Sequence, residues 1–437
     1  MRVAFLVHDF PKLSETFVLN QATGLIDRGH DVDIYTNRIH DPSEAHPDVE
    51  TYGLWDRTYQ LPETPSGLIP RVLKGMWLVM RHWHRNPALF GRSLNPFQCG
   101  LSALGFRLVY PATVLADKAP YDIIHSQFGT QSFCGMLFAR VQHPRPALVT
   151  TFRGYDISTC VKQEGASVYS PLFREGDFFL ANCEFFRQRA IELGCDPAQI
   201  RVHRSGLDCA KFPYRARQAP SDRGVHLVTT GRLVEKKGIE YAIRAVALLL
   251  PKYPDLRYSI IGDGFLRQPL QELINALNLN QAVHLLGWKN EQQIAAILQE
   301  ADLFVAPSVT AADGNQDAPV NVLKEAMAMG MPVISTWHGG IPELVEHGLN
   351  GLLVPERDAD ALAAQIELLI QHPEQWEGMG QAGRAAVEQH YNLHHLNDQL
   401  VDLYQMLNHA TDASIQAQQG LPTNLAGPAH PSVLLNK

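Results

Sequence analysis

The chain has 437 residues, of which 45% are hydrophobic and 19% charged, and its formal net charge is −8. This length predicts two domains of roughly 200 residues each, and the acidic balance argues against nucleic acid as the main partner. No apolar run approaches the length of a membrane span, and the start, MRVAFLVHDF, predicts a buried strand rather than a signal peptide, so a cytoplasmic protein is expected. Its six cysteines contain no CxxC pair, which predicts neither a zinc nor a redox site.

The first half of the chain alternates short apolar runs with amphipathic stretches. Val18, Ala22, Leu25 and Ile26 fall on one helical face and predict a helix over 16–28. A second helix is expected over 184–193. Strands are predicted at 2–7, 32–35, 123–124, 147–150, 178–180 and 200–203.

The stretch from Thr64 to Ala116 differs from the rest because it contains no Asp or Glu. Its cations are Arg71, Lys74, Arg81, Arg85, Arg92 and Arg107, interleaved with Trp77, Trp83, Phe90, Phe97 and Phe106. This composition fits a basic amphipathic surface that contacts an anionic membrane. It fits equally a helical insertion over the N-terminal sheet with solvated arginines.

The second half alternates strands and helices more regularly. Strands are predicted at 225–230, 257–261, 282–286, 302–306 and 332–335. Helices are predicted at 239–250, 266–277, 290–299, 319–329 and 341–347. Such alternation implies parallel sheets with helices on both faces.

The domain boundaries follow from these two runs of elements. An N-terminal Rossmann-like domain is expected over 1–212, a linker rich in Pro and Arg over 213–224, and a C-terminal Rossmann-like domain over 225–392. A last helix, 393–408, is expected to return to the N-terminal domain, and the tail 409–437, rich in Gln, Ala and Pro, is predicted to be disordered. The predicted fold is α/β, with two Rossmann-like domains facing each other across a cleft, where ligands of such folds bind.

The segment from Gly231 to Gly238, GRLVEKKG, follows a predicted strand and precedes a long helix. Free amides and the helix dipole favour an anion at such a turn, and Arg232 can fork onto phosphate oxygens. Neither half carries GxGxxG after its first strand, and no P-loop is present. A solvated basic turn is the alternative, but Lys236 and Lys237 would then oppose the helix dipole, so the segment predicts a diphosphate site.

Two carboxylates bracket the start of a later helix. Pro319 suits the first helical position, which puts Asp317 just outside the helix and Glu325 nearly two turns inside. The two acids would then lie about 9–12 Å apart along the axis, so that one could hold ribose hydroxyls and the other sugar hydroxyls. A helix-start acid and a solvated glutamate are the alternative reading.

Metal binding is not expected. Asp31-Val32-Asp33 and Asp358-Ala359-Asp360 match DxD, but the first opens a predicted strand and the second caps a helix, away from the phosphate-binding turn. His125 ends a strand and could face the cleft or lie in the core.

Several longer segments carry a family resemblance. GRLVEKKG, the D-x7-E before EAMAMGMPVIST, and HGGIPELVEHGLNGLLV resemble the C-terminal domain of retaining glycosyltransferases of family 4, which have the GT-B fold. In the N-terminal half the resemblance rests on FPKLSETFV, GHDVDIYT, DIIHSQFG and SGLDCAKF. The opening FP-x-x-SETF is particularly similar to exopolysaccharide transferases of the colanic-acid and amylovoran kind.

The resemblance implies a role for each matching position. Arg232 and Lys237 would neutralise the donor diphosphate as it leaves, and Glu325 would bind the ribose. Asp317 stands where the family usually has glutamate, against the transferred sugar. The other positions are the amides of Ala318, Val320 and Asn321 for sugar and phosphate, Gly287 and Trp288 for the base, and Ser14, Glu15 and Thr16 for the acceptor. A donor phosphate oxygen would take the acceptor proton, so neither a protein nucleophile nor a cofactor is expected.

Two positions depart from the family pattern. Arg153 replaces a frequent histidine in TFRGYD; it cannot act as a base, but it could hold a phosphate or an acidic sugar, or pair structurally with Asp156. Asp317 is one methylene shorter than glutamate, and Asp313 could compete for its role. The predicted catalytic set is Asp317, Arg153 and His125.

The expected activity is retaining transfer of a hexose from a nucleotide-diphosphate donor to a lipid-linked exopolysaccharide or oligosaccharide acceptor. The protein would then lie at the inner face of the cytoplasmic membrane, with residues 64–116 as its contact. A nucleotide-sugar epimerase of the same fold, a two-lobed binding protein and an inactive transferase homologue are the alternatives. The sequence does not reveal the base, the sugar, the linkage or the oligomeric state.

Overall fold

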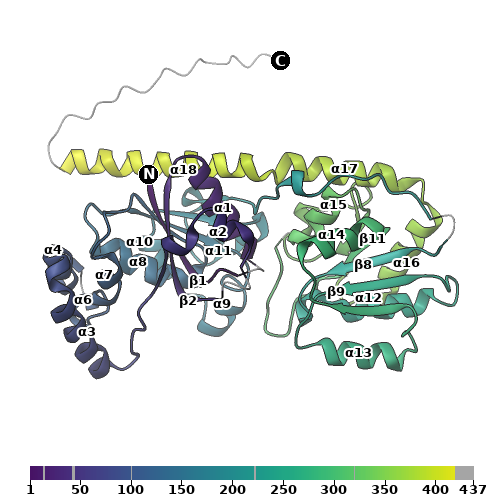
Figure 1. Ribbon diagram of the computed structural model, residues 1–437, viewed down its shortest axis with the longest axis horizontal. Coiled ribbons are helices and arrows are strands. Elements are labelled where there is room, and N and C mark those ends of the chain that lie inside the picture. The colour runs from purple at the N-terminus through teal and green to yellow at the C-terminus, as the bar shows by residue number, and fades with distance from the viewer. Residues whose placement is uncertain (13–14, 42–44, 100, 221–222, 319, 419–437) are drawn as a thin grey trace, which may run out of the picture.

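The computed structural model describes residues 1–12, 15–41, 45–99, 101–220, 223–318 and 320–418. Within these ranges the chain forms two α/β domains side by side (Figure 1). Helices α17 (Gln375–His390) and α18 (Leu393–Gln418) run along one side of both. The fold class predicted from the sequence, two Rossmann-like domains, is confirmed.

The N-terminal domain is built on a seven-stranded parallel sheet in the order β3-β2-β1-β4-β5-β6-β7. Its strands are β1 (Arg2–Phe10), β2 (Asp31–Ile39), β3 (Thr58–Gln60), β4 (Ile123–Ser126), β5 (Ala147–Phe152), β6 (Phe178–Ala181) and β7 (Ile200–Val202). Its helices are α1 (Thr16–Asp27), α2 (Pro47–Thr51), α3 (Leu68–His82), α4 (Pro87–Leu94), α5 (Pro96–Cys99), α6 (Leu101–Leu104), α7 (Val109–Leu115), α8 (Ser132–Val141), α9 (Thr159–Glu164), α10 (Ser170–Glu175) and α11 (Glu184–Glu192).

The C-terminal domain is built on a six-stranded parallel sheet in the order β10-β9-β8-β11-β12-β13. Its strands are β8 (His226–Thr230), β9 (Arg257–Ile261), β10 (Val283–Gly287), β11 (Leu303–Ala306), β12 (Val333–Thr336) and β13 (Leu352–Val354). Its helices before α17 are α12 (Ile239–Leu249), α13 (Arg267–Ala276), α14 (Glu291–Glu300), α15 (Asn321–Ala328) and α16 (Ala359–Gln371).

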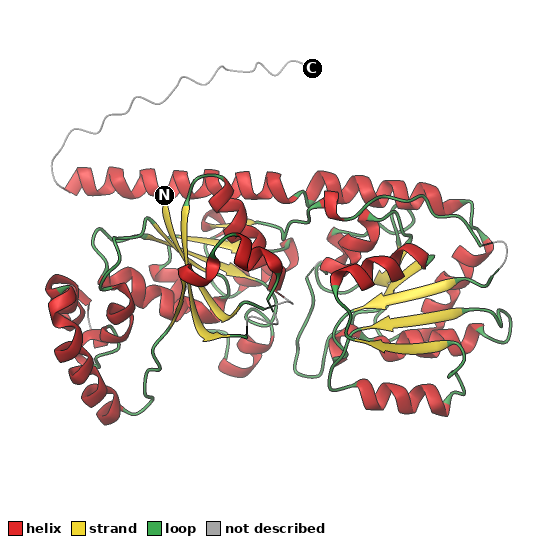
Figure 2. Ribbon diagram, in the orientation of Figure 1, coloured by secondary structure: helices red, strands yellow, loops and turns green. Residues whose placement is uncertain are grey.

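Both sheets place their ligand-binding edge toward the gap between the domains. Strand order reverses between β1 and β4 in one sheet and between β8 and β11 in the other, and side chains at such switch points frame a crevice at the carboxyl ends of the strands. The arrows of the C-terminal sheet in Figure 2 point toward the N-terminal domain. The two crevices therefore meet.

Most predicted strands and helices are present, but the helix expected over 341–347 is not. Residues Ile341–Glu343 form only a 3-10 turn, η9. The chain turns away because the Asn350 side chain accepts the amide hydrogen of Glu346 at 2.7 Å, and Gly348 has a positive φ of 83°. Two further differences are small: α15 begins at Asn321, and α18 continues to Gln418.

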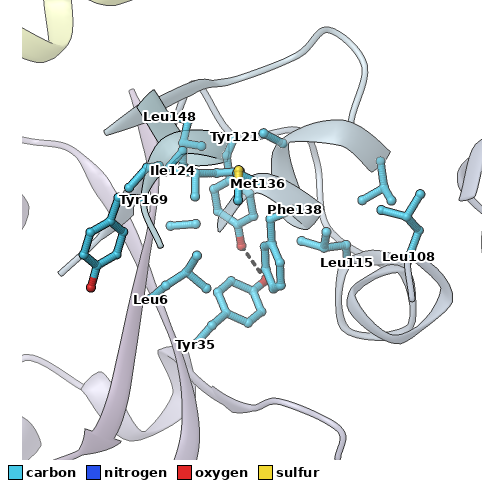
Figure 3. Packing of buried hydrophobic residues seen from close by; sticks show 14 of the residues in the cluster. Leu6, Tyr35, Leu108, Leu115, Tyr121, Ile124, Met136, Phe138, Leu148 and Tyr169 are labelled. Atoms are coloured by element: carbon cyan, nitrogen blue, oxygen red, sulfur yellow. Dashed lines mark hydrogen bonds between the residues drawn. The ribbon is translucent and has the colours of Figure 1, made fainter. Parts of the chain in front are cut away.

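Residues 64–116 form a helical insertion that is attached to the N-terminal sheet through α7. Figure 3 shows Leu108 and Leu115 of this insertion beside Met136 and Phe138 of α8, in one cluster with Tyr35 of β2. The cluster also holds a hydrogen bond between the hydroxyls of Tyr35 and Tyr121, at 2.8 Å. Helix α3 packs on this core through Leu78 and Val79, and it lies at the end of the N-terminal domain that is remote from the C-terminal domain (Figure 1).

The C-terminal helix α18 packs on the N-terminal domain. Leu400, Tyr404 and Leu407 of α18 belong to the same buried cluster as Val3 and Phe5 of β1. The chain therefore crosses between the domains twice, and the two crossings touch: the Leu207 amide donates to the Tyr391 carbonyl at 2.7 Å, and the Leu393 amide donates to the Leu207 carbonyl at 3.1 Å.

Candidate functional site

A cleft of about 980 Å³ lies between the two domains. The N-terminal domain contributes residues that include Glu15, Thr16, Phe17, Phe128, Arg153 and Asn182, and the C-terminal domain contributes residues that include Gly231, Arg232, Lys236, Lys237, Asp317, Ala318, Val320, Asn321 and Glu325. Ser14 lies outside the described residues. The structure thus brings most of the predicted donor-binding residues to one cavity, opposite Glu15 and Thr16.

The two lysines of GRLVEKKG stand on a 3-10 turn, η8 (Glu235–Lys237), that precedes helix α12. Gly238 ends this turn with a φ of 58°, and a Cβ there would lie 1.9 Å from the Pro307 carbonyl oxygen. Only glycine permits that approach in this conformation. The sequence therefore fixes both lysines at the carboxyl end of β8, beside the loop that follows β11.

Asp317 lies between these lysines and binds both. Its Oδ1 is 2.9 Å from the Lys236 Nζ, and its Oδ2 is 2.8 Å from the Lys237 Nζ. The Ser308 hydroxyl donates to Oδ2 at 3.1 Å. The anion that the sequence predicts at this turn is therefore supplied, in this structure, by the protein itself.

The electrostatics of this triad are strong because it is buried. Burial alone would raise the pKa of Asp317, but the ammonium groups of Lys237 and Lys236 outweigh it and hold that pKa far below its usual range. Burial lowers the pKa of Lys237, although the carboxylate of Asp317 opposes that shift. One carboxylate between two ammonium groups leaves one net positive charge, to which Arg232 on the same cleft adds another.

A histidine that the sequence analysis left unassigned orients Asp317. The Asp317 amide donates to the His338 Nε2 at 2.9 Å, and the His338 Nδ1 is 2.6 Å from a Glu356 carboxylate oxygen. Since Nε2 accepts, Nδ1 carries the proton toward Glu356. Gly339 approaches the same backbone, because a Cβ there would lie 2.1 Å from the Asp317 carbonyl oxygen. The signal in the sequence for this histidine is the segment His338-Gly339-Gly340, which belongs to the family resemblance.

Glu325 lines the cleft from helix α15, whose neighbouring Lys324 is fully buried. The Lys324 Nζ donates to the Ser205 carbonyl at 2.6 Å, which links α15 to the segment that leads out of the N-terminal domain. Burial lowers the pKa of Lys324 to about 7, with the Glu325 carboxylate opposing the shift. This buried lysine was not identified from the sequence, where it reads as one polar position in an amphipathic helix.

Arg153 occupies the opposite wall with neutral hydrogen-bond partners. Its guanidinium donates to the Gln127 side-chain oxygen at 2.6 Å and to the Ser205 hydroxyl at 3.3 Å, and it lies 4.0 Å from the Phe17 ring centroid. Burial lowers its pKa to about 10, so it stays protonated at neutral pH. It is therefore a cation and not a base.

The structural pairing expected between Arg153 and Asp156 is not observed at the guanidinium. The Asp156 carboxylate instead accepts the amides of Gly129 at 2.7 Å, of Gly154 at 2.8 Å and of Arg153 itself at 3.0 Å. Asp156 is used to fold the turn after β5, because its oxygens satisfy amides that have no strand partner. The Arg153 side chain is thereby left directed at the cleft.

His125 requires a correction, because the structure places it in the core and not at the cleft. Its side chain is fully buried, with Nδ1 2.6 Å from the Tyr404 hydroxyl of α18 and Nε2 2.6 Å from the Thr151 hydroxyl. Burial holds its pKa well below the usual range. A neutral histidine with both nitrogens engaged joins α18 to the sheet and cannot reach a substrate.

Three more positions lie apart from the cavity. Gly287 ends β10 and Trp288 follows it; neither is among the lining residues, and the Trp288 side chain is 63% exposed. Their role at a base stays a prediction. Asp313 does not line the cavity either; its carboxylate accepts the Asn315 amide at 2.8 Å, which leaves Asp317 without that competitor.

The DxD matches have structural partners. Asp31 pairs with Arg2 and Arg57, and Asp358 caps α16 by accepting the Ala361 amide at 2.8 Å. Within the described ranges no three His, Cys, Asp or Glu side chains gather as they would around a metal ion.

Direct contacts join the two walls near the cleft. The Glu343 carboxylate of η9 accepts the amides of Glu184 at 2.8 Å and Phe185 at 2.9 Å, which begin helix α11. The loop that carries Asp317 also reaches across, with the Arg189 guanidinium donating to the Gln316 side chain at 2.9 Å. Both contacts hold segments of the C-terminal domain, η9 and the loop before α15, against the N-terminal domain.

Comparison with known proteins agrees with this architecture. Residues 14–206 match the family described as "Glycosyl transferase 4-like domain", and residues 212–386 match "Glycosyl transferases group 1". Among solved structures, Anabaena Alr3699/HepE in complex with UDP is similar with a TM-score of 0.69 and 20% identity, covering 93% of this chain and 100% of that one. That likeness concerns the fold, and it confirms the expected GT-B arrangement.

Two curated relatives are similar over nearly the whole chain. The protein named as the colanic acid biosynthesis glycosyltransferase WcaL of Salmonella typhimurium is 35% identical over 413 residues, which cover 93% of this chain and 100% of the relative. The amylovoran biosynthesis glycosyltransferase AmsK of Erwinia amylovora is 34% identical over 412 residues, with the same coverage. The resemblance read from the motifs is thereby confirmed.

Proposed function

Because the chain belongs to the GT-B glycosyltransferases that include those of colanic acid and amylovoran biosynthesis, we propose that it transfers a hexose from a nucleotide-diphosphate donor, with retention, to a lipid-linked exopolysaccharide or oligosaccharide. One observation carries the proposal: Lys236 and Lys237 converge on a single buried carboxylate at the cleft. A site that binds an anion with two ammonium groups fits the diphosphate of such a donor.

Donor binding would exchange one anion for another. The diphosphate would take over the ammonium groups of Lys236 and Lys237 and gain Arg232, while Asp317 turns toward the hydroxyls of the transferred sugar. Glu325 lines the same wall, and its carboxylate would accept hydrogen bonds from the ribose hydroxyls. The amides of Val320 and Asn321 at the start of α15 would complete the anion site, because helix N-termini offer free N–H groups.

The transfer step needs no protein nucleophile. The bond between the anomeric carbon and the diphosphate oxygen breaks, the acceptor oxygen bonds to the same face of that carbon, and the acceptor proton passes to a departing phosphate oxygen. Negative charge grows on the diphosphate during this step, and fixed cations stabilise it. Lys237 would do so from one wall and Arg153, with its neutral partners, from the other.

The acceptor would approach from the N-terminal wall. Glu15 and Thr16 line the cleft there, and the Glu15 carboxylate is held by the Lys12 ammonium at 2.7 Å. A lipid-linked acceptor would bring the protein to the inner face of the cytoplasmic membrane. Within the described ranges no helix is long and apolar enough to cross a bilayer, so such an association would be peripheral.

A donor screen tests the proposal. Purified protein is incubated with UDP-, GDP- and ADP-sugars and with the free nucleotides, and thermal shift and nucleotide release are measured. Stabilisation by one nucleotide class, lost in Lys237→Ala and kept in Lys252→Ala, is expected; Lys252 is an exposed lysine paired with Glu367 on the C-terminal domain. Absence of any stabilisation would contradict the proposal, and conversion of the donor sugar without an acceptor would instead indicate an epimerase.

A further inference from the structure

Helix α3 in the N-terminal insertion buries one face and exposes another that is equally apolar. The buried side consists of Arg71, Gly75 and Leu78. Gly75 lies directly against Phe106, since a Cβ there would be 2.8 Å from that ring. These contacts fix which side of α3 faces the protein.

The opposite side of α3 carries large apolar side chains. Ile69 is 73% exposed, Leu73 is 59% exposed and Met80 is 74% exposed. At 100° per residue these three positions lie on the far side of the helix from Gly75. Burial in the protein therefore does not account for their apolar character.

The exposed apolar residues are concentrated in this insertion. Of the twenty large hydrophobic residues that are exposed on the described part of the chain, nine fall between residues 68 and 104. They are Leu68, Ile69, Leu73, Met76, Trp77, Met80, Trp83, Phe97 and Leu104. Single exposed hydrophobics are common on protein surfaces, but a continuous set on one helix marks an interaction surface.

The charged side chain that α3 itself exposes is a cation, Arg81, while Arg85 beyond its end is paired with Asp117. No Asp or Glu occurs from Thr64 to Ala116. Arg81 is exposed and lies 5.2 Å from the centroid of the Trp77 ring, whereas Arg71 and Lys74 turn toward the protein and donate to the Gly105 carbonyl at 2.9 Å and the Glu63 carbonyl at 2.8 Å. An aliphatic row with tryptophans and cations at its margin is the composition of helices that lie in the boundary layer of an anionic bilayer.

The same features argue against other occupants. A protein interface has a polar rim around its apolar centre, and a partner would need polar groups on α3 for that rim. The exposed face of α3 offers few polar side chains. A second copy of this chain would bring its Arg81 toward the Arg81 of the first, and residues 64–116 contain no acid to balance the two charges. Lipid headgroups supply the missing negative charge, and acyl chains accept the aliphatic row.

We propose that the face of α3 formed by Ile69, Leu73, Met76, Trp77 and Met80 inserts into the surface of an anionic lipid bilayer. The inference deepens the proposed function, on which it rests for the lipid-linked nature of the acceptor. Because α3 lies at the end of the N-terminal domain remote from the C-terminal domain (Figure 1), the membrane would hold the acceptor-binding domain and leave the donor-binding domain in the aqueous phase.

Vesicle flotation with the full chain tests this. Wild type is expected to float with vesicles of phosphatidylcholine and phosphatidylglycerol, less with phosphatidylcholine alone, and less again as salt rises. The double variant Leu73→Ser/Met80→Ser should bind the anionic vesicles at least about tenfold more weakly, since two buried side chains are lost. Leu248→Ser, at a 53% exposed leucine on α12 of the C-terminal domain, is the matched control and should bind as wild type does.

The outcomes separate this inference from the proposed function. Thermal shift by nucleotides is measured on every variant, and it should be unchanged in Leu73→Ser/Met80→Ser, which also reports that the variant is folded. Equal flotation of wild type and double variant, or none by either, would overturn the inference whatever the donor screen shows. A wild-type dimer that the double variant converts to a monomer, without vesicle binding, would assign the face to a second copy instead.

Discussion

The two walls of the cleft both present buried cations, but they balance them differently. On the C-terminal wall, Lys236 and Lys237 share the carboxylate of Asp317 at 2.9 and 2.8 Å. On the N-terminal wall, the Arg153 guanidinium is hydrogen-bonded by the neutral side chains of Gln127 and Ser205. One wall is thus a site whose anion is already present, whereas the guanidinium on the other wall is hydrogen-bonded by neutral groups and is attracted by the Asp156 and Glu15 carboxylates only from a longer distance.

From this difference we assign each wall a different part of the proposed transfer reaction. An anion that enters the C-terminal wall must displace a carboxylate, so that wall selects a strongly charged group such as a diphosphate. On the N-terminal wall, no carboxylate within the described part of the chain is hydrogen-bonded to the Arg153 guanidinium, so its charge would act on the anion that the first wall has positioned. Substitutions at Lys237, Arg153, Asp317 and Lys324 test this difference between the walls, with the largest effect expected at Lys237 and the smallest at Lys324.

Lys237→Ala should have the largest effect, because it removes a cation that both holds the resting carboxylate and would hold the diphosphate. We expect kcat/KM for transfer to fall by about 10²–10³-fold, the usual loss for one electrostatic donor at a developing negative charge. Steady-state kinetics with the donor found by the screen measure this. Lys252→Ala should behave as wild type, and a similar loss in both variants would remove Lys237 from the site.

Arg153→Gln should act mainly on kcat, since Arg153 would meet charge that develops during transfer. A decrease of about 10- to 100-fold is expected, comparable to one charged hydrogen bond. The donor KM should change little, and Arg153→Lys should recover part of the rate. A rise in donor KM at constant kcat would instead make Arg153 a ground-state binding group and abolish the distinction between the walls.

Asp317→Asn should separate binding from transfer. Without the resting carboxylate, a free nucleoside diphosphate no longer has to displace an anion, so its Kd should fall about threefold to tenfold. Transfer should nevertheless slow, because the proposed contact to the sugar is weakened. Isothermal titration measures the Kd, and an unchanged or raised Kd would show that the Asp317 pairing does not compete with the ligand.

Lys324→Met tests the point where the walls meet, since Ser205 touches both Lys324 and Arg153. The Lys324 pKa is about 7 in the folded protein and near 10.5 when unfolded, so between these values only the unfolded chain binds the proton. Folding stability should therefore rise with pH from 7 to 10 in wild type. The variant should be more stable at pH 7 and lack that part of the rise, as thermal melts across this range would show.

How much the sequence could predict differs between the two domains. In the C-terminal domain the 257–261 strand was predicted to the residue, since short strands and long amphipathic helices alternate there without insertions. The prediction of a helix at 341–347 was wrong. The apolar pattern there is helical, but Gly348 and Asn350, which lie outside that window, redirect the backbone. In the N-terminal domain most of the short helices of the insertion could not be predicted, because hydrophobic periodicity does not reveal helices this short.

The site could be predicted in its residues but not in its pairings. GRLVEKKG located the cations from local chemistry, but the Asp317 carboxylate is 80 residues away along the chain, and no local pattern shows that it lies between the lysines. His125 illustrates the same limit, since its surroundings depend on Tyr404 of the last helix, 279 residues later. The exposure of α3 also depends on which side meets Phe106, a long-range contact.

The return of α18 to the first domain has a consequence for how the protein is made. Leu400, Tyr404 and Leu407 complete the apolar surface over β1 and α1. During synthesis this surface is therefore exposed to solvent until nearly the whole chain has left the ribosome. The N-terminal half therefore lacks one part of its buried core until α18 docks, and premature termination before residue 393 should yield an aggregation-prone fragment. The backbone hydrogen bonds that join the two crossings, at Leu207, Tyr391 and Leu393, also limit how far one domain can rotate against the other.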